Sequence, residues 1–166
     1  MRIQLVKLDQ FSGEQASVYS IIYDEDDITL FEKFIIENKN SFLSELKNIS
    51  IRLRTIGTKT GARETFFKPN EGKPGDLVCA LYDEPKSKLR LYCIRYGTTL
   101  IIIGGGGPKL KSIRSLQEDS KLMEENQIMR TISELILKKI KDKSLSFSED
   151  YYDFEGDLDF LSTDYE

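Results

Sequence analysis

The most constraining feature of this sequence is a run of three short apolar segments separated by turns. Leu77–Tyr82, Leu89–Tyr96 and Leu100–Ile103 are rich in the β-branched and aromatic residues that are typical of strands. The first connection contains a proline, and Gly97-Thr98 is short enough for a tight turn. The pattern predicts an antiparallel meander. Because the middle segment has apolar residues on both faces, we expect it at the centre of the sheet, covered by helices on at least one side.

The flanking segments predict one further strand and three helices. Arg2–Leu8 alternates with period two, as a strand does. Asp27–Asn38 and Ser41–Ile56 have helical periodicity and a short connection, which predicts an antiparallel helical hairpin. β-branched residues weaken the second of these helices, so its second half could be extended instead. Ser115–Lys141 begins with a capping box and predicts the last helix. These helices could together cover one face of the meander and leave charged residues on the other.

Length and composition indicate a soluble α+β protein. The sequence predicts one domain over residues 1–145 and a tail over residues 146–166. No segment is long and apolar enough for a membrane span, and the N-terminus has no signal-peptide core, so we expect a cytoplasmic protein without a membrane partner. Cys79 and Cys93 lie in apolar segments, which predicts buried free thiols. Because a metal site would need more ligands and the chain contains no histidine, no metal site is expected. The sequence predicts no cofactor.

Charge is distributed unevenly along the chain. Residues 146–166 include eight acids and no base, whereas residues 50–115 include 13 bases and five acids, a net charge of +8. A basic centre can attract a polyanion, although solvated surface charge explains the same pattern. The acidic tail has interleaved aromatic residues, so it could pack on the basic body as a mimic of nucleic acid and inhibit it. A solvated terminus is the alternative.

Four glycines, Gly104–Gly107, follow the last strand of the meander directly. Their backbone N–H groups could form a nest for a phosphate, or the glycines could form a flexible or bulged strand end. The run is not a P-loop, because it lacks the Gly-Lys-Ser/Thr ending and Pro108 removes an N–H donor. We therefore favour a bulged strand end.

The order of these elements resembles the RelE/HigB/ParE superfamily of toxins from bacterial toxin–antitoxin systems. The similarity covers residues 60–140 and lies in the segment PNEGKPGDLVCALYDEPKSKLRLYCIRYGTTLIIIGGGGPKLK. It implies a RelE-like α+β fold, with an N-terminal strand and a helical hairpin packed on a twisted antiparallel sheet, and a C-terminal helix. The sequence departs from the family at Ala80-Leu81-Tyr82, where the family has Glu-Leu-Arg, and in the glycines before the basic loop.

The resemblance implies a toxin that cleaves messenger RNA on the ribosome, needs no metal ion, and is neutralised by a cognate antitoxin protein. Gyrase inhibition is the activity of the ParE branch. A non-catalytic protein-binding module on the same fold is the alternative, and a protein of another kind with an accidental resemblance is a third. By position, the resemblance implies that the catalytic cations, which would offset the charge of the scissile phosphate, are Arg90, Lys109 and Lys111. It implies substrate-binding roles for Tyr92, Arg95, Tyr96 and Arg114.

Strand geometry limits which of these residues can act together. Arg90 and Arg95 are five residues apart on one predicted strand, so they should face opposite sides of the sheet. Tyr92 shares a face with Arg90 and could present its phenol or ring to RNA. A place in the core or at its rim is the competing interpretation for Tyr92.

Overall fold

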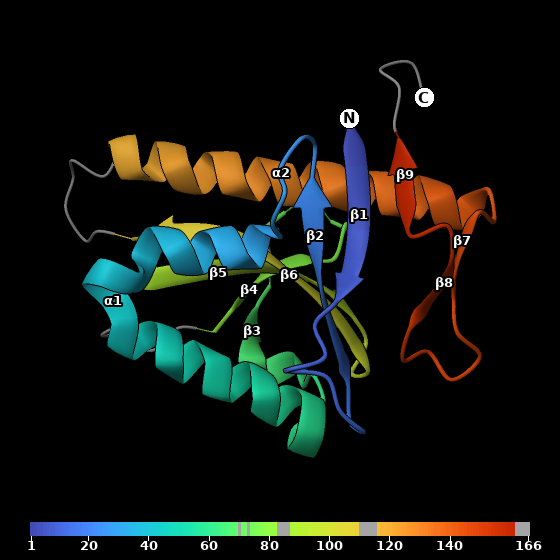
Figure 1. Ribbon diagram of the computed structural model, residues 1–166, viewed down its shortest axis with the longest axis horizontal. Helices are drawn as coiled ribbons and strands as arrows, with labels where there is room; N and C mark the ends of the chain where they lie inside the picture. The colour runs from blue at the N-terminus through green and yellow to red at the C-terminus, as the bar shows by residue number, and fades with distance from the viewer. Residues whose placement is uncertain (70, 73, 83–86, 110–115, 162–166) are drawn as a thin grey trace.

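The computed structural model describes residues 1–69, 71–72, 74–82, 87–109 and 116–161. In this part of the chain, seven strands form one mixed sheet in the order β3-β4-β5-β6-β2-β1-β9 (Figure 1). Its strands are β1 (Arg2–Lys7), β2 (Ser17–Tyr23), β3 (Phe67–Lys68), β4 (Val78–Leu81), β5 (Leu89–Tyr96), β6 (Leu100–Pro108) and β9 (Asp159–Leu161). A second sheet pairs β7 (Leu145–Phe147) with β8 (Phe154–Gly156).

The predicted meander is confirmed. β4, β5 and β6 pair antiparallel in chain order, and β5 is the middle strand of the three. Five side chains expected in the core are at most 1% exposed: Leu91, Cys93, Ile94, Ile101 and Ile103. Burial of each large apolar side chain of this kind contributes about 1.5–3 kcal/mol. The meander is therefore a well-buried part of the sheet.

The sequence led us to expect an antiparallel sheet. The sheet is mixed instead, because β2 pairs parallel with β6. The parallel register joins Ser17–Tyr19 to Leu100–Ile102. β2 also forms an antiparallel hairpin with β1, so the N-terminal hairpin extends the meander on its β6 side. The sequence pattern missed β2, whose partner in the meander lies about 80 residues away and is joined to it by no local turn. The fold is α+β with a mixed sheet.

In place of the two helices of the predicted hairpin, the structure has one helix with a kink. α1 (Leu30–Thr55) starts at Thr29, whose hydroxyl accepts a hydrogen bond from the Glu32 amide, and its backbone leaves the helical region at Phe42 (φ −135°, ψ 33°). The two arms on either side of this kink form a V in Figure 1. The second arm stays helical and continues into a π-helix (Ile56–Thr60), so the extended alternative does not occur. A 3₁₀ turn (Glu64–Phe66) leads into β3.

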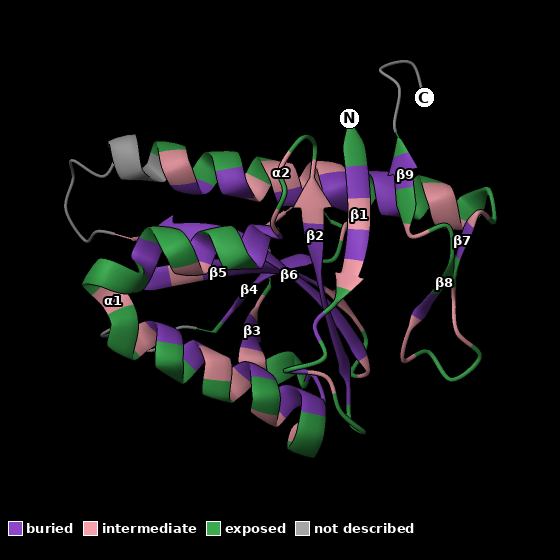
Figure 2. Cartoon of the chain, viewed as in Figure 1, coloured by how far each residue is buried: buried purple, intermediate pink, exposed green. Residues whose placement is uncertain are grey.

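The helices cover opposite faces of the sheet, which corrects the expectation that they cover one. α1 packs on the face that carries Leu91 and Cys93, and α2 (Leu116–Lys141) packs on the face that carries Tyr92 and Ile94. Figure 2 shows the buried sheet between the two layers. At β5 and β6 both faces are covered, whereas α1 packs on β2 and β6 and does not extend over β1 and β9 (Figure 1). Among the helices described, none is both long and apolar enough to cross a bilayer.

The glycine run is a strand, with an irregularity in the register opposite β5 between Leu91 and Cys93. This agrees with the bulged-strand interpretation. A Cβ on Gly104 would lie 2.2 Å from the Met129 sulfur, and one on Gly105 would lie 2.4 Å from a Glu125 carboxylate oxygen. Glycine is needed here because α2 lies directly on the backbone of β6.

The described part of the acidic tail, residues 146–161, is folded onto the body, as predicted. β9 pairs with β1 through Arg2–Gln4, and the β7–β8 hairpin packs its aromatic side chains into the α2-side core. The Phe154 ring lies 5.2 Å from that of Tyr19 and 5.5 Å from that of Tyr96. The boundary drawn from the sequence between residues 145 and 146 falls inside β7.

The two thiols, Cys79 and Cys93, are free, buried and directly opposite each other on β4 and β5. Burial raises the pKa of Cys79 to about 12 and the pKa of Cys93 well above its ordinary value. Since the thiolate is the reactive form, we expect native protein at about pH 8 to resist alkylation by iodoacetamide. Mass spectrometry should find no label before unfolding and two labels in guanidinium chloride. Labelling of the native chain at the unfolded rate would contradict this buried environment.

Candidate anion-binding site

A pocket of about 410 Å³ lies where α2 crosses β5. Its polar lining contains two arginines and one carboxylate, so its charge favours an anionic ligand. The lining residues come from three elements: Arg90 and Tyr92 from β5, Glu71 from the loop before β4, and Leu122, Met123, Asn126, Gln127 and Arg130 from α2. The α2 residues recur at three- and four-residue intervals, which places them on one side of the helix.

Arg90 has an incompletely satisfied guanidinium group. Its Nε is buried and has no hydrogen-bond acceptor among the described residues. A buried polar donor without a partner costs about 1–3 kcal/mol, and more when the group is charged. An anion that enters the pocket and accepts this hydrogen bond would remove that cost. The charge of Arg90 and its Nε, which is unpaired within the described residues, thus favour an anionic ligand over a neutral one.

Tyr92 contributes a hydroxyl group to the pocket while its ring is buried in the core. Burial raises the pKa of Tyr92, and the negative charge of Glu71 adds to the increase. The positive charge of Arg90 and hydrogen bonding with Arg90 and Asn126 oppose the increase without cancelling it. Tyr92 thus stays protonated at neutral pH and can donate a hydrogen bond, but its buried ring cannot stack on a base.

Three residues of α2 hold the loop that carries Glu71. The Asn126 side-chain amide donates to the Glu71 carbonyl oxygen at 2.6 Å. The Arg130 Nε lies 3.9 Å from an Asp76 carboxylate oxygen, and the Ser133 hydroxyl donates to the Asp76 carbonyl oxygen. Their spacing of four and then three residues gives one row along the helix. The loop that carries Glu71 is therefore fixed to the helix that forms one wall of the pocket.

The structure brings together only some of the residues predicted from the sequence. Arg90 and Tyr92 line one pocket, as their spacing on a strand implies. Lys109 follows β6 two residues after Gly107, the register partner of Arg90, so its backbone lies at the same end of the hairpin. Lys111 and Arg114 lie outside the described residues.

Arg95 and Tyr96 are placed away from this pocket. Arg95 is on the opposite face of β5 from Arg90, as predicted. Its Nε donates a hydrogen bond to the Ala62 carbonyl oxygen at 2.8 Å, and its guanidinium group lies 6.0 Å from the centre of the Phe67 ring. Arg95 lines a separate pocket of about 490 Å³ beside β3 and β4. Tyr96 packs on Phe147 and Phe154 at the turn end of the hairpin, so its side chain is part of the core.

Sequence reasoning missed six pocket residues, the apolar Leu122 and Met123 and four polar ones: Glu71, Asn126, Gln127 and Arg130. Among the polar ones, the three α2 residues lie on the polar side of an amphipathic helix. A polar side of this kind has the same sequence pattern whether it faces a ligand or solvent. Glu71 lies in a loop whose sequence predicts only a turn. No local signal distinguishes these residues before the helix is placed on the sheet.

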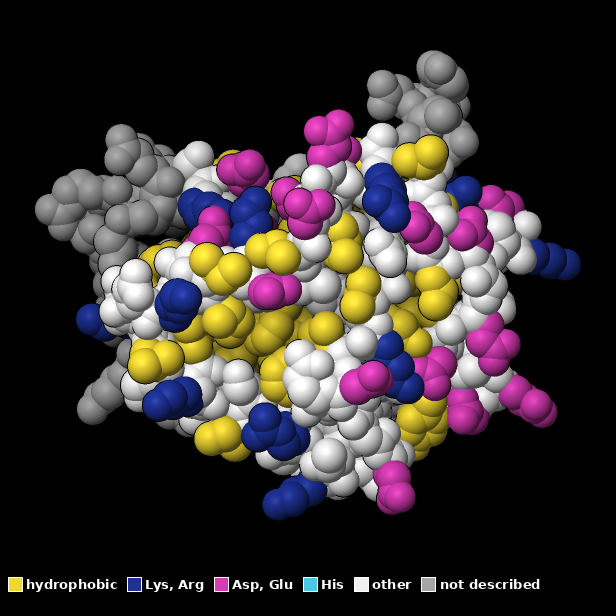
Figure 3. All heavy atoms as spheres, viewed as in Figure 1, with side chains coloured by type: hydrophobic (Ala, Val, Ile, Leu, Met, Phe, Trp, Pro, Cys, Tyr) yellow, Lys and Arg dark blue, Asp and Glu magenta, His cyan; other side chains and the backbone are white. Residues whose placement is uncertain are grey.

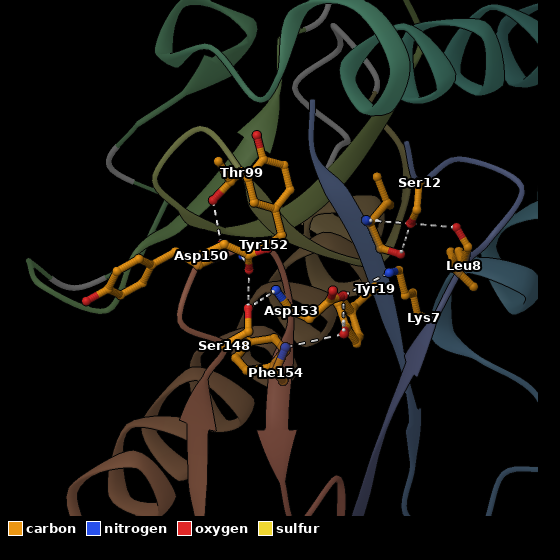
Figure 4. A network of polar contacts seen from close by, with 12 residues as sticks. Lys7, Leu8, Ser12, Tyr19, Thr99, Ser148, Asp150, Tyr152, Asp153 and Phe154 are labelled. Atoms are coloured by element: carbon orange, nitrogen blue, oxygen red, sulfur yellow. Dashed lines mark hydrogen bonds and ion pairs between the residues drawn. The ribbon is translucent and has the colours of Figure 1, made fainter. Parts of the chain in front are cut away.

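The tail is anchored at the other end of the hairpin. The Tyr19 hydroxyl donates to an Asp153 carboxylate oxygen at 2.9 Å, the Lys7 ammonium lies 2.9 Å from the same oxygen, and the Thr99 hydroxyl donates to the Tyr151 carbonyl oxygen (Figure 4). Burial would raise the pKa of Asp153, but hydrogen bonds from Lys7 and Tyr19 outweigh burial and lower it. The described part of the tail thus meets the turn after β5, six residues or about 20 Å along the strand from Arg90.

This position corrects the expected autoinhibitory contact. The tail packs back on the body, but its described residues lie over β1, β2 and the hairpin turn and not over the Arg90 pocket. The partners of its carboxylates include Lys7 and Arg2, which belong to the N-terminal strand. The tail is held mainly as part of the core and not as a cover for the basic centre.

A second surface feature lies on α1. Three apolar residues of this helix, Ile36, Leu43 and Ile51, are exposed. Independently of these residues, Figure 3 shows hydrophobic side chains gathered in the hollow between the two arms of the helix. Lysine and arginine side chains border this hollow along the second arm. Such an apolar surface with a polar border is typical of a protein-binding site.

The described residues include no group of three or more histidine, cysteine, aspartate or glutamate side chains placed to hold a metal ion. Comparison of the chain with protein-family models, with curated proteins and with solved structures found no match.

Proposed function

We propose that the protein is a RelE-like toxin that binds RNA at the Arg90 pocket and cleaves it without a metal ion. The observation that carries the proposal is the buried Nε of Arg90, which has no acceptor among the described residues and lies in a pocket with a second arginine. A phosphate group would supply an acceptor for Arg90 and could also bind Arg130 beside its ion pair with Asp76, because guanidinium groups match phosphate oxygens in charge and geometry. The resemblance of residues 60–140 to the toxin superfamily supports RNA as the source of that phosphate.

The pocket contains the groups that cleavage by the neighbouring 2′-hydroxyl needs. The Glu71 carboxylate would accept the proton of the 2′-hydroxyl, and the 2′-oxygen would attack phosphorus. The 5′-oxygen would leave and take up a proton from solvent, giving a 2′,3′-cyclic phosphate and a 5′-hydroxyl end. Arg90 and Arg130 would stabilise the additional negative charge on the phosphate oxygens, and the Tyr92 hydroxyl would donate a further hydrogen bond.

The antitoxin in this proposal would be a protein that binds the apolar surface of α1. Exposed Ile36, Leu43 and Ile51 and the basic border of the hollow favour a partner segment with apolar and acidic residues. The same observation supports the alternative function, a non-catalytic protein-binding module, because it is independent of the Arg90 pocket. Cleavage activity is what separates the two functions.

The proposal is tested by expression of the chain alone and by an RNA cleavage assay with the purified protein. We expect growth arrest and cleavage, and we expect Arg90→Ala and Glu71→Gln each to lower the cleavage rate about 10²–10³-fold, because each removes a group that acts on the transition state. Arg63→Ala, which removes an exposed arginine outside the pocket, is the matched control and should keep the full rate. Circular dichroism checks that every variant is folded.

Two results would overturn this assignment. If wild-type protein neither arrests growth nor cleaves RNA, the chain is not a ribonuclease toxin. If folded Arg90→Ala cleaves as fast as wild type, the active site lies elsewhere on the molecule.

A further inference from the structure

One wall of the pocket presents an exposed apolar side chain beside polar ones. Met123 is 69% exposed, although its neighbour Leu122 is buried. Met123 lines the pocket at its edge, four residues before Gln127 and seven before Arg130. A methionine side chain is flexible and polarisable, and it packs well against flat rings. The side of α2 that faces the pocket therefore combines a surface for a ring with a cation for a phosphate.

Gln127 is the polar group next to this apolar surface. Its side-chain nitrogen makes one contact, 3.4 Å long, with the Thr131 hydroxyl. The residue is exposed, so its amide can turn toward a ligand without loss of a strong hydrogen bond. An amide offers a donor and an acceptor together, which is the arrangement that pairs with the edge of a nucleobase.

The spacing along α2 matches one nucleotide. Seven residues of α-helix between Met123 and Arg130 span about 10 Å, which is comparable with the distance from a phosphate to the far side of its base. Arg90 and Tyr92 lie across the pocket from this row. A phosphate bound by Arg90 and Arg130 would place an attached base within reach of Met123 and Gln127.

We infer that the pocket binds one unstacked nucleotide of single-stranded RNA, with the base packed on Met123 and its edge read by Gln127. This inference rests on the proposed function and adds a specificity-determining position to it. Bases of duplex RNA are stacked and paired, so only a single strand can supply a free ring and a free edge. The site should therefore select single-stranded RNA and prefer some bases over others at one position.

The inference is tested by fluorescence anisotropy with short oligoribonucleotides that carry 2′-fluoro groups, which prevent cleavage. An abasic sugar is placed at each position in turn. We expect one position at which loss of the base weakens binding about three- to tenfold, because apolar surface is no longer buried. Met123→Ala should cause a similar loss with the intact probe and no further loss with that abasic probe. Gln127→Ala should change the preference among the four bases there.

Leu137→Ala is the matched control, since Leu137 is an exposed apolar residue of α2 outside the pocket. It should leave binding of the intact probe unchanged. If Arg90→Gln weakens binding while Met123→Ala and every abasic probe leave it unchanged, the pocket binds phosphate without a base; the inference is then wrong and the proposed function stands. If Arg90→Gln also leaves binding unchanged, the proposed site itself is wrong.

Discussion

Gly106→Ala is expected to lower the free energy of unfolding by about 3 kcal/mol or more. A Cβ at this position would lie 1.8 Å from the Arg90 carbonyl oxygen and 3.1 Å from the Leu91 Cα. Both are backbone atoms of β5, so no side-chain rotation can relieve the contact. Either β5 or β6 would have to move at the centre of the sheet, where both faces are packed against helices. Urea denaturation followed by circular dichroism measures the loss.

Gly107→Ala is the matched control in the same strand. The closest atom to a Cβ at Gly107 is the Cγ of Lys121 at 3.4 Å, and the lysine side chain can adjust. The backbone at Gly107 does not require a positive φ, so alanine should cost less than about 1 kcal/mol. Equal losses in the two variants would mean that the glycines serve the flexibility of the strand and not the close approach of β5.

The glycine run also connects the packing of the sheet to the pocket. Gly106 lies against the backbone of Arg90, and Gly104 and Gly105 allow α2 to lie close to β6. The distance between α2 and β5 sets the width of the pocket that these two elements form. The four glycines of β6 thus lie beside the Arg90 end of β5 because α2 and β5 both approach the β6 backbone closely.

Local signals account for the part of the fold that the sequence predicts. The meander follows from strand-forming residues, tight turns and apolar alternation, all within 30 residues of chain. The helical hairpin follows from periodicity, and the break at Phe42 lies within a few residues of the expected connection. The parallel contact between β2 and β6 depends on how the N-terminal hairpin docks, and no local pattern specifies it.

The choice of faces and the site are also long-range properties. Leu91 and Cys93 face one helix, and Tyr92 and Ile94 face the other. The sequence shows that both faces of β5 are apolar, but it does not show which helix covers which face. Arg90 and Tyr92 share a face by simple alternation, and this part of the site could be predicted. The α2 residues opposite them could not, because a polar helix position has the same pattern whether it faces solvent or a ligand.

The tail contributes two buried aromatic side chains, Phe154 and Phe160, to the α2-side core. Phe154 is 4% exposed, and its ring contacts those of Tyr19, Tyr96 and Phe147 at centroid distances of 5.2, 5.5 and 5.4 Å. Phe154→Ala removes all three ring contacts and leaves a cavity, so the free energy of unfolding should fall by about 3–5 kcal/mol. Thermal and urea unfolding of the full chain measure the effect.

Leu161→Ala is the matched control, because Leu161 is an apolar residue of the same tail but is 68% exposed. It distinguishes loss of a buried side chain from a substitution anywhere in the tail. This substitution should change the free energy of unfolding by less than about 0.5 kcal/mol. If Phe154→Ala costs no more than Leu161→Ala, the tail is not part of the core. If the predicted difference is found, deletion of residues 146–166 would expose part of the α2-side core, against which the helix of the Arg90 pocket is packed. A change in RNA binding after that deletion could then come from damage to the fold. Point substitutions in the pocket are therefore the better test of RNA binding.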